Sequence, residues 1–144
     1  MSVAPSGAFI ALAALAAIAL TGCTPKDELS ARLLDDALTV ALCDPEQSNV
    51  IQFTADDEVI WRAVSDADPA FLTGELGYGE LPDGYTNELG PRPLPIDSLD
   101  RLRVELLLER DGDLVGRYGA FFEGDALRAG DWVDEDGRRS TEAC

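Results

Sequence analysis

The side chains that could do chemistry in this chain are carboxylates and thiols. The 144 residues include 28 Asp and Glu, three Cys and no His. Without His, a Ser-His-Asp triad and the usual zinc site are both impossible, and a Cys nucleophile lacks its commonest activator. Paired carboxylates can hydrolyse a glycosidic bond at the right separation, but so many acidic residues form pairs by chance. We therefore predict that the protein is not an enzyme, with no catalytic residues and no cofactor.

Three acidic clusters are the candidates for a metal site, because Ca²⁺ takes six to eight oxygen ligands. None of them matches the calcium loop of an EF-hand. Each also lies where a β-hairpin needs Asp and Gly for its turn, so turn formation is the favoured interpretation and no metal site is predicted. The clusters are Asp56-Asp57-Glu58, Asp111-Gly112-Asp113 and Asp134-Glu135-Asp136.

Tyr78 and Tyr85 are the candidate binding residues. Both lie in the stretch 65–100, which is rich in Gly and Pro, and binding residues often lie on loops held by a rigid scaffold. Local packing is the alternative for both tyrosines, and it is the favoured one. Three other aromatic residues are expected in the core instead: Trp61, Phe122 and Trp132.

The N-terminal segment, residues 1–22, carries no Asp, Glu, Lys or Arg. Within it, residues 8–20 form an unbroken apolar run, which as a helix would span roughly 20 Å. That length is short of the ~30 Å hydrocarbon core of a bilayer. Length and position predict the apolar helix of a signal peptide, with a buried apolar helix and an uncleaved membrane helix as alternatives.

The apolar run closes on Leu20-Thr21-Gly22-Cys23, which is an aliphatic residue and two small ones before a Cys. This tetrapeptide resembles the lipobox of bacterial lipoproteins. The resemblance implies that a diacylglycerol is attached to the sulfur of Cys23 and that a peptidase removes residues 1–22. Two acyl chains suffice for stable anchoring. The mature chain would then be held at the extracytoplasmic face of the cell membrane.

With Cys23 lipidated, Cys43 and Cys144 remain, in a compartment that favours disulfides. We expect these two residues to pair. A terminal residue such as Cys144 frays unless it is tied down, and a bridge closing a loop of about 100 residues contributes up to ~4.7 kcal/mol in the chain-entropy model. A free buried thiol and an intermolecular bridge are the alternatives.

Two regions follow the predicted cleavage site. Residues 23–36 are interpreted as the lipidated Cys and a tether, in which Leu29, Leu33 and Leu34 have the spacing of a short helix. Residues 37–144 are interpreted as one folded domain, in which apolar and polar residues alternate in short segments typical of β-strands.

The strongest hairpin signal in that domain lies near its C-terminal end. Apolar and charged residues alternate over 101–109, Asp111-Gly112 favours a tight turn, and 114–122 runs back. About seven short strands favour an all-β, antiparallel β-sandwich with an architecture like that of immunoglobulin domains. The other predicted strands are 38–43, 50–55, 59–64, 71–76 and 127–133, with 138–144 pairing back on the last.

The net charge of −17 argues against nucleic acid as a partner. Trp132, Asp136-Gly137 and Cys144 are similar to the ends of small uncharacterised lipoproteins of actinobacteria, a likeness that implies no activity. Our first hypothesis is a non-catalytic binding or interaction module, which contacts the membrane through the lipid on Cys23 and uses the loops of 65–100. The second is an accessory subunit that contacts a protein of the cell envelope. The third is a small hydrolase or a calcium-dependent protein.

Overall fold

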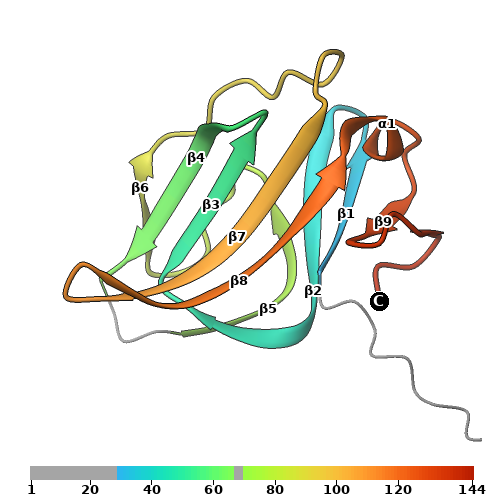
Figure 1. Cartoon of the computed structure of the whole chain (residues 1–144). Coiled ribbons are helices and arrows are strands. Elements are labelled where there is room, and N and C mark those ends of the chain that lie inside the picture. Colours follow the sequence, from blue (N-terminus) through green and yellow to red (C-terminus); the bar gives the residue numbers. More distant parts are fainter. Residues whose placement is uncertain (1–28, 67–69) are drawn as a thin grey trace, which may run out of the picture.

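The computed structural model describes residues 29–66 and 70–144. In these residues the chain is nearly all β, and two antiparallel sheets pack as a sandwich (Figure 1). The predicted all-β antiparallel sandwich is therefore confirmed. The predicted signal peptide, residues 1–22, and the predicted lipidation site Cys23 lie outside the described residues. In the described part of the chain, no helix has both the length and the apolar character needed to cross a membrane.

Each sheet has five described strands. Sheet A consists, in spatial order, of β10 (Arg139–Ser140), β9 (Trp132–Asp134), β1 (Leu29–Leu34), β2 (Ala37–Ser48) and β5 (Ala70–Gly77). Sheet B consists of β6 (Tyr85–Leu89), β4 (Glu58–Ser65), β3 (Val50–Ala55), β7 (Arg101–Arg110) and β8 (Asp113–Glu123). One helical turn, α1 (Gly124–Leu127), leads from β8 to β9. Immunoglobulin domains have seven to nine strands, whereas the two sheets here have five described strands each. The likeness to immunoglobulin domains is therefore one of sandwich architecture and not of strand number.

The core lies between the sheets and is filled by the inward-facing side chains of alternate positions. Its largest fully buried residues are Trp61, Phe53 and Phe122, and the rings of Phe53 and Trp61 lie 5.2 Å apart between centroids. This confirms Trp61 and Phe122 as core residues. Trp132 is also buried, but it lies outside the main core cluster, where the guanidinium of Arg32 is 4.7 Å from its ring centroid.

Aspartates in the left-handed region of the backbone make the tight turns. Asp56 and Asp57 join β3 to β4 with φ of 46° and 72°, and Asp111 and Gly112 join β7 to β8 with φ of 53° and 84°. Two-residue hairpin turns need positive φ at these positions, which Asp and Gly tolerate. The predicted hairpin of 101–109 with 114–122 is confirmed, and the predicted strands 50–55 and 59–64 pair as a second hairpin.

The short helix predicted at residues 29–34 is wrong, because Leu29–Leu34 form strand β1 and belong to the sandwich rather than to a tether. The earlier part of the predicted tether, residues 23–28, lies outside the described residues. Leu29, Ala31 and Leu33 are all buried in the core, and this spacing of two is that of a strand. The helical spacing of Leu29, Leu33 and Leu34 therefore does not reflect a helix. Asp35-Asp36 then forms a turn with φ of 49° and 64°, which lets β1 pair with β2.

The predicted strands 38–43 and 127–133 differ from the structure at their ends. Strand β2 continues past residue 43, because the register with β5 shifts between Leu42 and Glu46 and a bulge there tolerates proline. The segment after β8 turns first, because Arg128 donates from Nη1 to the carbonyl oxygen of Leu99 at 3.1 Å. The chain becomes extended again only in β9.

Candidate interaction surface

The two tyrosines predicted as binding residues are built into the core. The side chain of Tyr85 is buried, and its hydroxyl donates a hydrogen bond of 2.8 Å to the carbonyl oxygen of Ser48. Tyr78 is half-buried, and its ring meets those of Phe53 and Trp61 edge to face at centroid distances of 5.3 Å and 5.6 Å. Such aromatic contacts are typical of packing.

The hydroxyl groups of both tyrosines are engaged as well. That of Tyr78 lies 3.1 Å from the carbonyl oxygen of Ile60 and 2.8 Å from that of Arg92. Burial raises the pKa of both phenols above their usual value of 10.0, because a phenolate is poorly solvated there. These contacts favour the packing alternative for Tyr78 and Tyr85, and a binding role for them stays a prediction.

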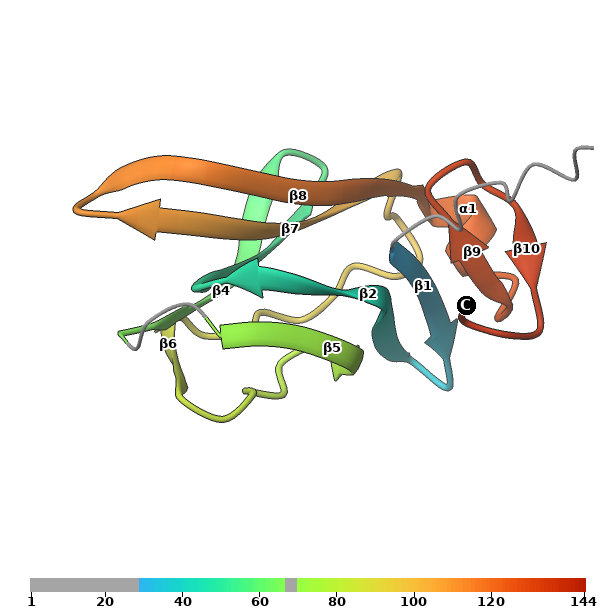
Figure 2. The same ribbon diagram turned by 90° about the horizontal axis from the view of Figure 1, so that it is seen from below.

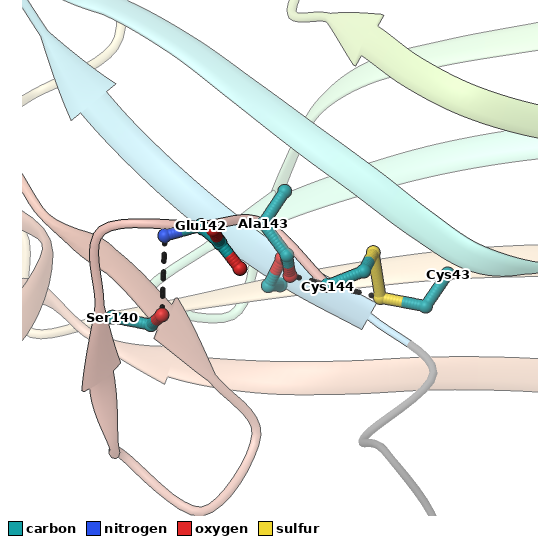
Figure 3. The surroundings of a disulfide bond; sticks show 6 residues. Cys43, Ser140, Glu142, Ala143 and Cys144 are labelled. Atoms are coloured by element: carbon teal, nitrogen blue, oxygen red, sulfur yellow. Dashed lines mark hydrogen bonds between the residues drawn. A yellow bond between two sulfur atoms is a disulfide. The ribbon is translucent and has the colours of Figure 1, made fainter.

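The C-terminal residues cross the outer face of sheet A (Figure 3). Cys144 forms a disulfide with Cys43 of β2, with an S–S distance of 2.06 Å, so the predicted pairing is present. On the way, the carbonyl oxygen of Ala143 accepts a hydrogen bond of 2.5 Å from the hydroxyl of Ser30 on β1. The C-terminal residues therefore occupy part of that face, and the candidate interaction surface lies on sheet B.

The outer face of sheet B is centred on a buried carboxylate. The side chain of Glu105 on β7 is only 5% exposed, although it lies on the face away from the core. Arg103 and Arg117 each place Nε 3.3 Å from one of its oxygens, and Gln52 donates to it at 3.2 Å. The two ion pairs and the hydrogen bond from Gln52 offset the cost of burying the charge. Gly119 lies directly opposite on β8, where it leaves room for this side chain.

A second ionic centre lies on the same face at Arg62 of β4. Its guanidinium forms ion pairs with Glu88 of β6 and Glu109 of β7 and donates to Gln52 at 2.8 Å. Desolvation lowers the pKa of Arg62, but the hydrogen bonds that it donates to Glu109 and Glu88, together with the charges of these carboxylates, outweigh it and raise the pKa above its usual value. A row of fixed polar side chains thus crosses all five strands of sheet B.

One end of this row carries a surplus of positive charge. We call Arg101, Arg103, Arg117 and Phe121 the arginine patch. The guanidinium carbons of Arg101 and Arg103 lie 5.2 Å and 5.8 Å from the centroid of the Phe121 ring, which is the geometry of cation–π contacts. Within residues 29–66 and 70–144, Glu105 is the one carboxylate that forms ion pairs with the patch.

Three members of the arginine patch line a hollow of about 310 Å³ on β7 and β8. They are Arg103, Arg117 and Phe121, and the lining is completed by Glu105, Tyr118 and Gly119. Guanidinium groups around an aromatic ring can bind carboxylate or phosphate groups. Chemically, this surface can hold an anionic group beside an apolar one.

The sequence alone does not reveal the arginine patch. The alternation of apolar and polar residues assigns its members to the solvent side of two strands, but it does not say which of them lie side by side. The signal that could have found it is Gly119. A glycine inside an otherwise regular strand often marks a close approach, and a Cβ at this position would lie 2.8 Å from the carbonyl oxygen of Val104 and 3.1 Å from Cγ of Glu105.

Aspartates of two acidic clusters accept hydrogen bonds from the backbone. Asp56 accepts hydrogen bonds from the backbone N–H groups of Asp100 and Arg101 at 3.1 Å and 2.8 Å. Asp134 accepts from the backbone N–H groups of Asp136 and Arg138 at 3.0 Å and 2.8 Å. Over the residues that the structure covers, no group of three or more Asp, Glu, Cys or His could hold a metal ion.

Comparison with protein-family models, with curated proteins and with solved structures finds no match to this chain.

Proposed function

We propose that this protein is a lipid-anchored, extracytoplasmic module that binds a partner without catalysing a reaction. In this proposal Cys23 carries the lipid, residues 1–22 are removed, and the sandwich projects from the cell membrane. Its outer surface on sheet B provides the contact. The lipid raises the local concentration of the module at the membrane, which strengthens a weak contact with any partner held there.

The observation that carries this proposal is the pairing of the cysteines. The sequence has three Cys, and the disulfide takes Cys43 and Cys144. Cys23, the residue that closes the lipobox-like tetrapeptide, is left for another modification. A disulfide is also the bond expected of an exported protein, since reducing compartments keep thiols reduced.

The position of β1 supports a short tether in this proposal. The strand begins at Leu29, so that only residues 23–28 separate the lipid from the folded domain. At the maximum reach of about 3.5 Å per residue, this segment spans roughly 20 Å. Leu29 pairs with Leu42, next to the disulfide at Cys43. The module would therefore sit close to the bilayer with its disulfide end toward the headgroups.

Metabolic labelling with palmitate tests the anchor. We expect label on the wild-type protein and none on Cys23→Ala, which should also leave the membrane fraction. The control is the double variant Cys43→Ser/Cys144→Ser, which removes both other thiols and should keep the label. Label that persists in Cys23→Ala would refute the proposed anchor.

A further inference from the structure

Strand β8 leaves one of its two backbone edges unpaired by any strand that the structure describes. It forms the end of sheet B, with β7 as its hydrogen-bonded neighbour, and it runs for 11 residues. Figures 1 and 2 show that the β7–β8 hairpin extends beyond the other strands of its sheet. An edge strand presents a row of N–H and C=O groups that can pair with an added strand.

The side chains of β8 do little to block such pairing. Natural edge strands are usually protected by prolines, by many charges or by being short, whereas β8 is long, has no Pro and has charges only at Asp113, Arg117 and Glu123. Its exposed apolar residues are Leu114, Val115 and Phe121, at 49%, 53% and 51%. They are three of the five exposed large hydrophobic residues of the described chain. Exposed apolar side chains gathered on one element mark contact surfaces.

The charge around β8 indicates which kind of strand would pair with it. The chain has a net charge of −17, yet Arg103 and Arg117 lie against β8 with the one carboxylate of Glu105 between them. Arg101, at the end of the patch, lies beside acidic side chains, those of Asp56, Asp57, Asp100 and Glu123. A second copy of this chain would bring its own arginines to the same edge, where like charges repel. An acidic strand from a different protein would meet complementary charge.

We propose that β8 is the docking edge for an extended acidic segment of a partner protein. The segment pairs with the backbone of β8 as a sixth strand of sheet B. Its carboxylates contact Arg103 and Arg117, and its apolar side chains cover Phe121 and Val115. This inference rests on the proposed binding role but not on the lipid at Cys23, so loss of the anchor would leave it standing.

Binding of designed peptides tests the charge requirement. The probes are fluorescein-labelled alternating peptides of about ten residues, a usual upper length for a strand, with Glu-Val, Gln-Val or Lys-Val repeats. Fluorescence anisotropy would be measured with the protein purified from cells in mild detergent. We expect Glu-Val repeats to bind most tightly, Gln-Val repeats more weakly and Lys-Val repeats not at all, with affinity falling as salt screens the charges.

A matched pair of variants locates the contact. Arg117→Gln removes one charge from the arginine patch and should weaken the binding of the Glu-Val peptide about threefold, the effect of one exposed charge pair. Arg139→Gln removes the same charge from β10 on sheet A, where the residue is exposed, and should leave the affinity unchanged. Equal effects of the two variants would show that only net charge matters and would overturn the proposal.

Hydrogen–deuterium exchange tests the strand pairing. The bound Glu-Val peptide should slow exchange in residues 113–123, while β6, at the opposite edge of sheet B, serves as the internal control and should be unaffected. Protection elsewhere, or equal binding of the acidic and basic peptides, would overturn the proposal. Protection of 113–123 that grows with protein concentration in the absence of peptide would overturn it too, in favour of a second copy of this chain.

Discussion

At the scale of single residues, the outer face of sheet B is polar but ordered. Glu105 is almost fully buried on a surface that faces away from the core, because Arg103, Arg117 and Gln52 surround it. Arg62 is fixed in the same way by two carboxylates. Preorganised side chains lose less conformational entropy on binding than free ones. This favours sheet B as a contact surface.

The buried tyrosines predict how stability depends on pH. Burial raises the pKa of Tyr78 and Tyr85 in the folded protein, so that above pH ~10 the unfolded chain loses its phenolic protons first. Their contribution to stability is complete below that pH and is lost as pH rises through the folded pKa values. We expect the urea midpoint of the wild type to fall between about pH 8 and pH 11.

The double variant Tyr78→Phe/Tyr85→Phe is the control for that dependence. Other groups also titrate at high pH, but they are shared by both proteins and cancel in the comparison. The double variant should be less stable than the wild type at about pH 8, because it lacks the buried hydrogen bonds, and should lose less stability on alkalinisation. An equal loss in both proteins would show that these phenols do not titrate differently on unfolding.

At the scale of elements, Gly119 allows β7 and β8 to approach with Glu105 between them. We expect Gly119→Ala to destabilise the fold by about 1–3 kcal/mol, the usual cost of overpacking, since the added Cβ would meet the backbone oxygen of Val104 at 2.8 Å. Gly90→Ala is the control, because nothing lies within 4 Å of a Cβ there. Urea unfolding measures both, and equal stabilities would contradict the close packing.

The C-terminal segment predicts the effect of removing the disulfide. Cys43 and Cys144 are 101 residues apart in sequence, so the bridge restricts a long loop in the unfolded chain. The variant Cys43→Ser/Cys144→Ser should lose about 2–5 kcal/mol of stability, and reduction of the wild type should have the same effect. An unchanged melting temperature in both experiments would mean that the disulfide adds nothing to stability.

Hairpins are the elements that sequence predicts best here. The pairs β3–β4 and β7–β8 carry their own turn residues, Asp56-Asp57 and Asp111-Gly112, and their alternation is local. Strand β1 escaped prediction because the helical spacing of its leucines hid its alternation, although Asp35-Asp36 gives it the same kind of turn into β2. Helix α1 escaped prediction because the turn after it is held by a distant contact, from Arg128 to the carbonyl oxygen of Leu99.

The candidate site was less predictable than the fold. Tyr78 and Tyr85 lie in a Gly- and Pro-rich stretch, which suggested binding loops, but their rings reach back to the core and their hydroxyls bond backbone carbonyls. The arginine patch is assembled by the register between β7 and β8. A register of this kind is not encoded in the spacing of either strand alone.

At the scale of the whole molecule, the two outer faces of the sandwich differ in what covers them. The disulfide and the C-terminal residues cover part of sheet A, near the start of β1. Sheet B presents its ionic row and the edge of β8. In the proposed function, the disulfide end of the domain lies toward the bilayer, and the outer face of sheet B is available to a partner. The tether between lipid and domain then spans roughly 20 Å at most.

The mass of the intact protein extracted from membranes tests the central claim most directly. We predict a single species that begins at Cys23, contains residues 23–144 with one disulfide, and carries the added mass of acyl chains. Recovery of residues 1–144 from the soluble fraction, with no added acyl mass, would contradict the anchor and with it the proposed placement of the module.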